Sequence, residues 1–378
     1  MHALAQEFIN GGHRVTVVAP VDGVSQKETY ESKGIEFLLH PSFRTRAPKS
    51  LIEPALYARK LARFLITKHD PCPPDLVLCF QYTYAATAKR VWPGTPVGFL
   101  AGAAAWDWHS SLYGHRNALF RMLLYSKLPA ALRVERLAMS RAEKVYVEGN
   151  MLSQRLLKFH PGWKNKIGIL PAPVDTNRFA PSAETRCRLR KELQIAEQTK
   201  VILAVGRLDR NKNFETLIRA ASILACGNWL VLIAGEGWNG DSLRNLSSSL
   251  GLNERVKFLG RRNGIEAVYS ASDIFAHPTV LESYGNVVLE AMASALPCIV
   301  SNGRRVGISY DLTNGTNALL VDPNDPHAWA TQIELLMKDG NLSHRLGQEG
   351  RRFCEVRPQW KDIAATLLND LVNRGARV

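Results

Sequence analysis

The chain has 378 residues, 46% hydrophobic and 22% charged, a composition typical of globular proteins with room for about two domains. The longest uncharged apolar stretch, residues 98–106, is far shorter than the roughly 20 residues of a membrane-spanning helix, and the N-terminus shows no signal-peptide pattern. The six cysteines form no CxxC pair and no Cys/His cluster, so they predict neither a disulfide framework nor a metal site. A cytoplasmic location is expected.

The net charge of +14 is distributed unevenly along the chain. Residues 1–180 contain 24 Lys and Arg against 13 Asp and Glu, whereas residues 181–378 contain 24 against 21. A basic surface attracts nucleic acid, anionic lipid headgroups or phosphorylated substrates. We therefore expect an anionic partner for the first half.

Short apolar and β-branched segments alternate with amphipathic ones, which predicts βα units wound around parallel sheets. The strands expected in the first half are 14–19, 35–39, 75–80, 96–101, 144–147 and 166–170. Those expected in the second half are 200–205, 229–234, 255–259, 273–277, 297–300 and 318–321. The predicted fold class is α/β, with two doubly wound domains.

The joint between these domains is predicted from prolines. Pro171, Pro173 and Pro181 interrupt regular structure, and we place the boundary near Asn177. The last helix, 360–373, fits either domain. The expected domains are residues 1–176 together with 358–378, and residues 177–357.

The start of the chain differs from that of an ordinary doubly wound domain. A helix over residues 1–10 precedes the strand 14–19, where such a domain normally opens on a central strand and its phosphate-binding loop. We expect the first strand of this domain to be missing, as in a fragment, a misassigned start or a degenerate copy.

A phosphate-binding pattern follows the strand 200–205. Gly206 ends the strand, and Arg207 and Lys212 precede the next helix. Arg offers a fork of donors and Lys a point charge, so the segment suits a diphosphate. Alternatively the two cations are solvated loop charges, and this motif alone leaves both readings open.

Two carboxylates stand eight positions apart in the second half. Glu282 lies on a loop, and Glu290 lies about one turn into a helix that begins near Gly285 and Asn286. Carboxylates accept hydrogen bonds from sugar hydroxyls. If both were exposed helix-end acids, the apolar neighbours of Glu290 would be unexplained, because a buried acid needs a partner.

These motifs resemble the consensus of retaining glycosyltransferase family 4, and the resemblance extends over nearly the whole chain. The further segments that carry it are 12–20, 170–181, 233–237, 256–260 and 317–325. The E-x7-E spacing is a specific signal. The resemblance implies a GT-B fold, in which two Rossmann-like domains face each other across a cleft, the first binding the acceptor and the second the donor.

The resemblance also implies residue roles. Arg207 and Lys212 would hold the nucleotide diphosphate, Glu290 the ribose hydroxyls, and Glu282 the donor sugar, with catalytic importance. The implied donor-binding set is Gly206, Arg207, Lys212, Arg262, Glu282, Gly285, Asn286 and Glu290. The nucleotide sugar would be a co-substrate, with no cofactor and no metal, because cationic side chains neutralise the leaving diphosphate.

The sequence departs from the family in the first half. Where the family often has a donor-contacting histidine, this chain has Ala101 and Gly102, and Ala318 stands where a glycine is usual. His109, next to Trp108, is a candidate to take over the catalytic role of this absent histidine. A loop histidine beside tryptophans also suits packing or an acceptor site.

Residues 116–144 intersperse seven Lys and Arg among leucines and other apolar residues. This suits an interfacial helix on an anionic membrane, where a lipid-pyrophosphate acceptor would be presented. The alternative is a helix that packs its leucine face on the sheet and leaves its arginines solvated. Nucleic acid is not expected as a partner, because the charges are dispersed and the sequence contains no recognisable nucleic-acid-binding motif.

The function expected from these observations is transfer of a hexose-like sugar from a nucleotide-diphosphate sugar, such as a UDP-sugar. The acceptor would be a polysaccharide or a lipid-linked glycan of the cell envelope, and the protein a cytoplasmic enzyme, peripheral to the membrane. The alternatives are a catalytically silent binding subunit and, less favoured, a nucleotide-sugar epimerase.

Overall fold

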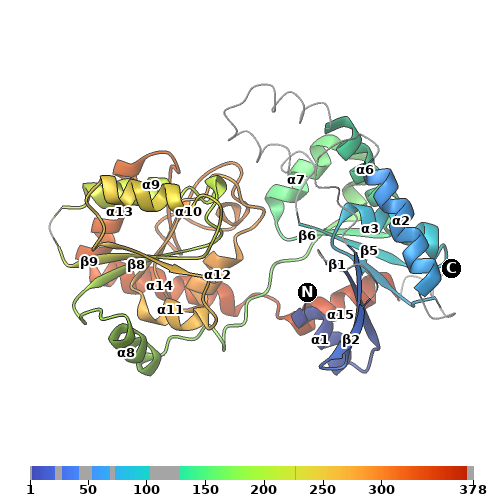
Figure 1. Cartoon of the computed structure of the whole chain (residues 1–378), viewed down its shortest axis with the longest axis horizontal. Helices are drawn as coiled ribbons and strands as arrows, with labels where there is room; N and C mark the ends of the chain where they lie inside the picture. Colours follow the sequence, from blue (N-terminus) through green and yellow to red (C-terminus); the bar gives the residue numbers. More distant parts are fainter. Residues whose placement is uncertain are drawn as a thin grey trace. The chain divides into compact units, whose positions relative to one another are not determined.

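The computed structural model describes residues 2–21, 28–41, 53–68, 73–102, 128–225 and 227–372. The chain forms two compact α/β units (Figure 1). Unit 1 comprises Met1–Glu148, Leu152–Pro171 and Pro358–Val378, and unit 2 comprises Gly149–Met151 and Ala172–Arg357.

The described residues of unit 2 form a parallel sheet in the order β10-β9-β8-β11-β12-β13. The strands are β8 (Lys200–Val205), β9 (Trp229–Ala234), β10 (Val256–Gly260), β11 (Ile274–His277), β12 (Cys298–Ser301) and β13 (Leu319–Val321). The order runs outward from β8 in both directions, which is the doubly wound arrangement. Every strand predicted from an apolar segment of this half is present.

Helices cover both faces of this sheet. They are α8 (Ala183–Glu192), α9 (Phe214–Ile223), α10 (Gly240–Ser249), α11 (Ile265–Ala271), α12 (Asn286–Ala293), α13 (Pro326–Lys338) and α14 (Gly340–Glu355). Successive strand residues face opposite sides: Val201 packs in a core cluster with α8, α11 and α12, and Ile202 in one with α9, α10 and α13. Figure 1 shows α9 and α13 on one face and α8 and α11 on the other.

Unit 1 contains two separate sheets within its described residues. Three strands pair in the order β1-β3-β2, and four parallel strands in the order β4-β5-β6-β7. Their bounds are β1 (Val15–Val21), β2 (Glu28–Ser32), β3 (Ile35–Pro41), β4 (Val77–Cys79), β5 (Val97–Ala101), β6 (Lys144–Val147) and β7 (Ile167–Ile169). The antiparallel strand β2 was not predicted, because its polar sequence ETYES lacks an apolar segment and it is held by backbone pairing to β3.

The described helices of unit 1 pack on the two faces of the four-stranded sheet, except α2, which packs on α3. They are α1 (His2–Asn10), α2 (Glu53–Lys68), α3 (Tyr82–Val91), α6 (Leu128–Arg141), most of α7 (Asn150–Phe159), and α15 (Trp360–Leu371). The final helix α15 approaches β5 closely at Gly98, where a Cβ atom would lie 2.6 Å from Leu371 Cδ1. Glycine in β5 therefore permits the C-terminal helix to complete this unit.

The basic segment 116–144 is described only in its last part. In α6, Ala138 and Met139 are buried in the core, while Arg133 and Arg136 are exposed. This part follows the packing alternative, with the apolar face inward and arginines in solvent. His109 and residues 103–127 as a whole lie outside the described residues.

None of the helices in the described ranges is long and apolar enough to cross a membrane.

Candidate functional site

The predicted donor-site residues of unit 2 lie on loops that follow the carboxyl ends of parallel strands, and on the helix α12. In open α/β sheets this edge is where ligands bind, because loops and helix N-termini converge there. Gly206, Arg207 and Lys212 follow β8, Arg262 follows β10, and Glu282, Gly285, Asn286 and Glu290 follow β11. The fold thus brings this set to one edge of one sheet.

Two loops at this edge run in direct backbone contact. Gly206 N–H donates to Ala234 O (3.0 Å) and Leu208 N–H donates to Glu236 O (2.9 Å). A Cβ on Gly235 would lie 1.9 Å from Gly206 O. Any other residue at position 235 would therefore separate the loops and displace the cation-bearing segment.

Asp209 orients the cations that follow β8. One carboxylate oxygen caps the short 3-10 helix η3 (Arg210–Lys212) by accepting from the N–H groups of Asn211 (3.0 Å) and Lys212 (3.2 Å). The other oxygen accepts from Arg207 Nε at 2.5 Å. The Arg207 side chain is still 71% exposed, so its remaining donors are available to a ligand.

Lys212 pairs with Glu282 across the edge. Lys212 Nζ donates to Glu282 Oε2, and both side chains are mostly buried. The backbone of Glu282 is fixed on both sides: its N–H donates to Arg305 O (2.8 Å), and its carbonyl accepts from Gly307 N–H (3.0 Å). The cationic loop and the first carboxylate of the E-x7-E motif therefore share one site.

His277, the last residue of β11, lies behind this ion pair. It is 1% exposed, and its Nε2 is 3.8 Å from Glu282 Oε2 without a hydrogen-bond partner in the described part of the chain. Burial, and then the charge of Lys212, lower the pKa of His277 well below its ordinary value. The imidazole is thus neutral beside the charged pair at neutral pH.

The second carboxylate, Glu290, has the partner that its apolar surroundings required. Tyr269 donates its hydroxyl hydrogen to Glu290 Oε2 at 2.8 Å, and also lies 3.2 Å from Val287 O. Burial raises the pKa of Glu290, while the hydrogen bond from Tyr269 and the charge of Arg178 oppose that rise. Glu290 is therefore a half-buried acceptor held in a fixed orientation.

The helix that carries Glu290 begins at a turn that requires a positive φ. Gly285 has φ 114° and precedes the first residue of α12, Asn286. A Cβ at Gly285 would lie 3.2 Å from Ile308 Cγ2. Glycine here lets the chain turn sharply from Glu282 into a helix whose N-terminus suits an anion.

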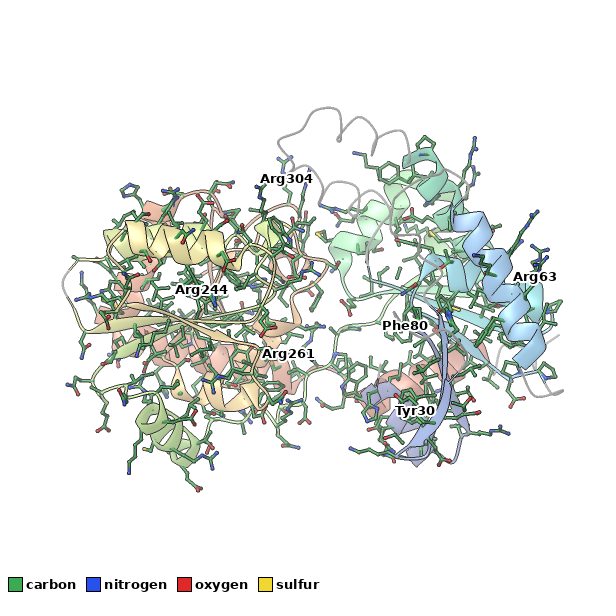
Figure 2. All side chains as sticks on the ribbon, in the orientation of Figure 1. Tyr30, Arg63, Phe80, Arg244, Arg261 and Arg304 are labelled. Carbon is green, nitrogen blue, oxygen red and sulfur yellow. The ribbon has the colours of Figure 1, made fainter. Side chains whose placement is uncertain are left out.

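The loop after β10 is attached to its neighbours. Arg261, labelled in Figure 2, donates its N–H to Glu236 Oε1 (3.3 Å), and Arg262 Nη1 lies 3.4 Å from Glu192 Oε1. Arg262, one of the donor-binding residues implied by the resemblance, therefore belongs to an ion pair with α8.

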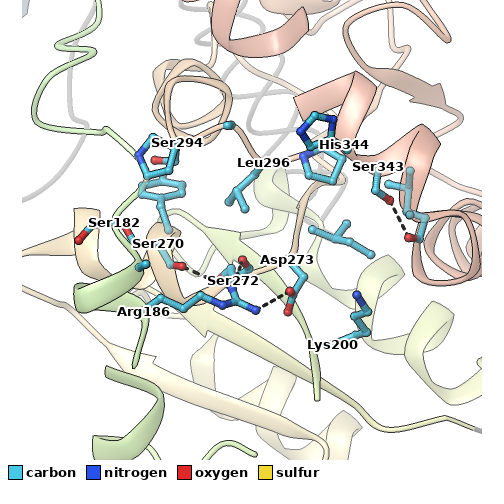
Figure 3. A pocket seen from close by; sticks show the side chains of 18 residues that line it. Ser182, Arg186, Lys200, Ser270, Ser272, Asp273, Ser294, Leu296, Ser343 and His344 are labelled. Atoms are coloured by element: carbon cyan, nitrogen blue, oxygen red, sulfur yellow. Dashed lines mark hydrogen bonds and ion pairs between the residues drawn. The ribbon is translucent and has the colours of Figure 1, made fainter. Parts of the chain in front are cut away.

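A pocket of about 440 Å³ lies at the opposite edge of the sheet (Figure 3). Its lining includes Lys200 and Ile274, the first residues of β8 and β11. Arg186, also in its lining, is bound to Asp273 at 2.7 Å. This pocket therefore faces the amino-terminal edge, and its lining includes Tyr269 but none of the donor-site residues predicted from the sequence.

Three residues of the site were not assigned a role from the sequence. Asp209 could have been found as an N-cap residue two positions after Arg207, and His277 as a polar residue ending a buried strand. Tyr269 gave no local signal, because its bond to Glu290 joins residues 21 positions apart. Ala101, where the family often has histidine, is a buried residue of β5.

Solved structures share this architecture. Anabaena HepE, solved with UDP and glucose, superposes with a TM-score of 0.76 at 20% identity, covering 97% of this chain and 94% of that one. WaaG, a glycosyltransferase involved in lipopolysaccharide biosynthesis, gives a TM-score of 0.76 at 18% identity with the same coverage. The two α/β units therefore place the chain in the GT-B fold class, as the sequence predicted.

Family comparisons specify the class further. The family model described as "Glycosyltransferase Family 4" matches residues 1–178, and "Glycosyl transferases group 1" matches residues 185–353. The chain belongs to glycosyltransferase family 4.

A curated relative, the D-inositol 3-phosphate glycosyltransferase of Corynebacterium glutamicum (strain R), is 33% identical over 233 residues. The match covers 58% of this chain and 55% of the relative, so the chain spans about half the length of the curated relatives it matches.

Proposed function

We propose that this glycosyltransferase transfers a hexose-like sugar from a nucleotide-diphosphate sugar, with UDP as the nucleotide, and that it retains the anomeric configuration. The observation that carries the proposal is the convergence of Lys212, Glu282 and the Glu290-bearing helix α12 at one sheet edge. The Anabaena HepE structures with UDP support the choice of nucleotide.

In the proposed donor complex, Arg207 and Lys212 bind the diphosphate. The first turn of α12, beginning at Asn286, adds N–H donors and the positive end of the helix dipole. Lys212 exchanges its bond to Glu282 for one to phosphate, which frees the Glu282 carboxylate to accept from the sugar hydroxyls. Glu290, held by Tyr269, accepts from the ribose hydroxyls.

The chemical step is a front-face substitution at the anomeric carbon. The bond from this carbon to the phosphate oxygen breaks, a bond to the acceptor oxygen forms on the same face, and the leaving phosphate oxygen takes the acceptor proton. Negative charge grows on the diphosphate, where Arg207, Lys212 and α12 stabilise it. The role of the protein is then positioning and charge stabilisation, without a protein nucleophile, cofactor or metal in the proposed step.

We further propose that the acceptor is a polysaccharide or lipid-linked glycan of the cell envelope, and that the enzyme works at the cytoplasmic face of the membrane. The basic charge of residues 1–180 supports an anionic acceptor or surface. The likeness to WaaG, which is involved in lipopolysaccharide biosynthesis, supports the envelope assignment.

A thermal-shift panel with UDP, GDP, ADP and their sugar conjugates tests the donor assignment. A ligand at 100 times its dissociation constant stabilises the folded protein by about 2.7 kcal/mol, which raises the melting temperature by a few degrees. We expect a shift with UDP that is lost in Arg207→Ala and Glu290→Ala and retained in Arg219→Ala, a control arginine paired with Glu215 on α9. A lack of any shift in the wild type would overturn the proposal.

A second measurement separates the enzyme from a silent binding subunit. Incubation with UDP-glucose and other UDP-sugars should release UDP slowly by transfer to water. Binding without any hydrolysis or transfer would favour the catalytically silent alternative.

A further inference from the structure

The loop from Glu282 to Gly285, which carries the first carboxylate of the proposed donor site, is called the donor loop below. Tyr284 lies in this loop, and its ring is buried, with 1% exposure. Its hydroxyl group donates to Asp311 Oδ2 at 2.6 Å and accepts from Arg357 Nη2 at 2.5 Å. Burial, the largest effect, raises the pKa of Tyr284, and the positive charge of Arg357 opposes this. The phenol therefore stays protonated and can keep both bonds.

Arg357 connects Tyr284 to the ends of unit 2. It is the last residue of this unit before Pro358, and Ala172 is the first residue after Pro171. Arg357 Nε donates to Ala172 O at 3.0 Å, and its guanidinium lies 5.3 Å from the centre of the Tyr284 ring. Two of the segments through which the chain passes to unit 1, at Ala172 and at Arg357, are therefore bonded to each other, and Arg357 bonds one of them to Tyr284.

The backbone of the donor loop is tied to the same cluster. Tyr284 O accepts from Ile308 N–H at 2.8 Å, and Asp311 N–H donates to Ile308 O at 2.9 Å. A Cβ on Gly307 would lie 2.0 Å from Ser283 O, so the two segments touch along their backbones. Tyr284 therefore cannot move without also shifting the segment 307–311, against which the donor loop is packed.

We propose that Tyr284 is a positioning residue that couples the Glu282 loop to the connecting segments at Ala172 and Arg357. A nucleotide bound at the donor loop would then make these segments more rigid. The rigidity of the segments would in turn affect the position of Glu282. This inference rests on the proposed function for its ligand, but the coupling itself is a property of the chain.

The coupling can be tested without ligand by amide hydrogen exchange on two variants and one control variant. Tyr284→Phe keeps the ring and removes the hydroxyl, and Arg357→Met removes the other partner. We expect Arg357→Met to speed exchange of the Val288 and Ile308 amides about tenfold, although the substitution lies 69 and 49 positions away in sequence. Tyr284→Phe should speed exchange at Val356 and Arg357 to a similar degree.

Tyr269→Phe is the matched control, because it removes the hydroxyl of another buried tyrosine in the same unit. It should leave Val356 and Arg357 unchanged. The amides of β9 should keep their protection in every variant. Equal acceleration in β9, or no effect of Arg357→Met on Val288 and Ile308, would overturn the coupling.

A second arm uses UDP. In the wild type, UDP should slow exchange at Lys212 and Val288, and also at Val356 and Arg357. In Tyr284→Phe it should slow exchange at the first two only. Absence of protection at Lys212 and Val288 in the wild type would contradict the proposed function, while the ligand-free arm would still decide the coupling.

Discussion

Lys212 and Glu282 form an ion pair although 70 positions separate them in the sequence. The pair joins the loop after β8 to the loop after β11, two strands that are neighbours in the sheet. Because each charge satisfies the other, a bound diphosphate has to compete with Glu282 for Lys212. Substitutions of Lys212 and of Glu282 should therefore have different effects on nucleotide binding.

Lys212→Met should weaken UDP binding by roughly tenfold to a hundredfold, because a charge-assisted hydrogen bond is lost. Glu282→Gln should bind UDP at least as tightly as the wild type, since Lys212 is released from its partner, yet should lose sugar transfer. Isothermal titration with UDP and a transfer or hydrolysis assay measure the two effects. Weaker UDP binding in Glu282→Gln would contradict the competition.

Glu290→Ala should lower UDP affinity by about tenfold or more, because the carboxylate no longer accepts from the ribose hydroxyls. The same substitution should have little effect on the affinity for 2′,3′-dideoxy-UDP, which lacks these hydroxyls. Tyr269→Phe should give an intermediate loss, because the carboxylate stays but loses the bond that orients it. Equal losses for both ligands would place Glu290 away from the ribose.

His277 should make the stability of unit 2 depend on pH. Its pKa is lowered in the folded state, so below about pH 6.5 the unfolded chain binds a proton that the folded chain does not. The free energy of unfolding should therefore fall as the pH drops below 6.5, by up to about 1.4 kcal/mol per pH unit. Urea unfolding at several pH values should show a smaller slope in His277→Gln than in the wild type.

His327→Gln, which removes an exposed histidine of α13, controls for the loss of an imidazole in the same unit. An identical slope in the wild type and His277→Gln would show that His277 is not the group responsible.

Gly307→Ala should displace the loop that carries Glu282. The added Cβ would lie 2.0 Å from Ser283 O, a backbone atom that cannot move alone. We expect a loss of about 1–3 kcal/mol of stability and of most UDP binding. Gly340→Ala, at the start of α14 with nothing within 4 Å of the new Cβ, should leave both unchanged. Circular dichroism melts and UDP titration compare the two variants.

The strands, and the places in the fold of the residues proposed to bind the donor, were predictable because their signals are local. An apolar segment such as 229–234 reports its own burial, and two glycines mark the ends of elements near charged residues, Gly206 beside Arg207 and Gly285 three positions after Glu282. The strand β2 lacked such a signal, since its stability comes from pairing with β3. The E-x7-E spacing also placed Glu290 inside a helix, where the structure has it.

The sequence by itself determined the α/β class, the strand positions of unit 2 and the family. Only the tertiary structure decided the partners: Lys212 with Glu282, Glu290 with Tyr269, and Tyr284 with Arg357. These pairs join residues 21 to 73 positions apart, and periodicity carries no information about which distant side chains meet. Their identity follows from the strand order and from burial, because a polar group enclosed by the packed elements must be satisfied by whichever partner lies within reach.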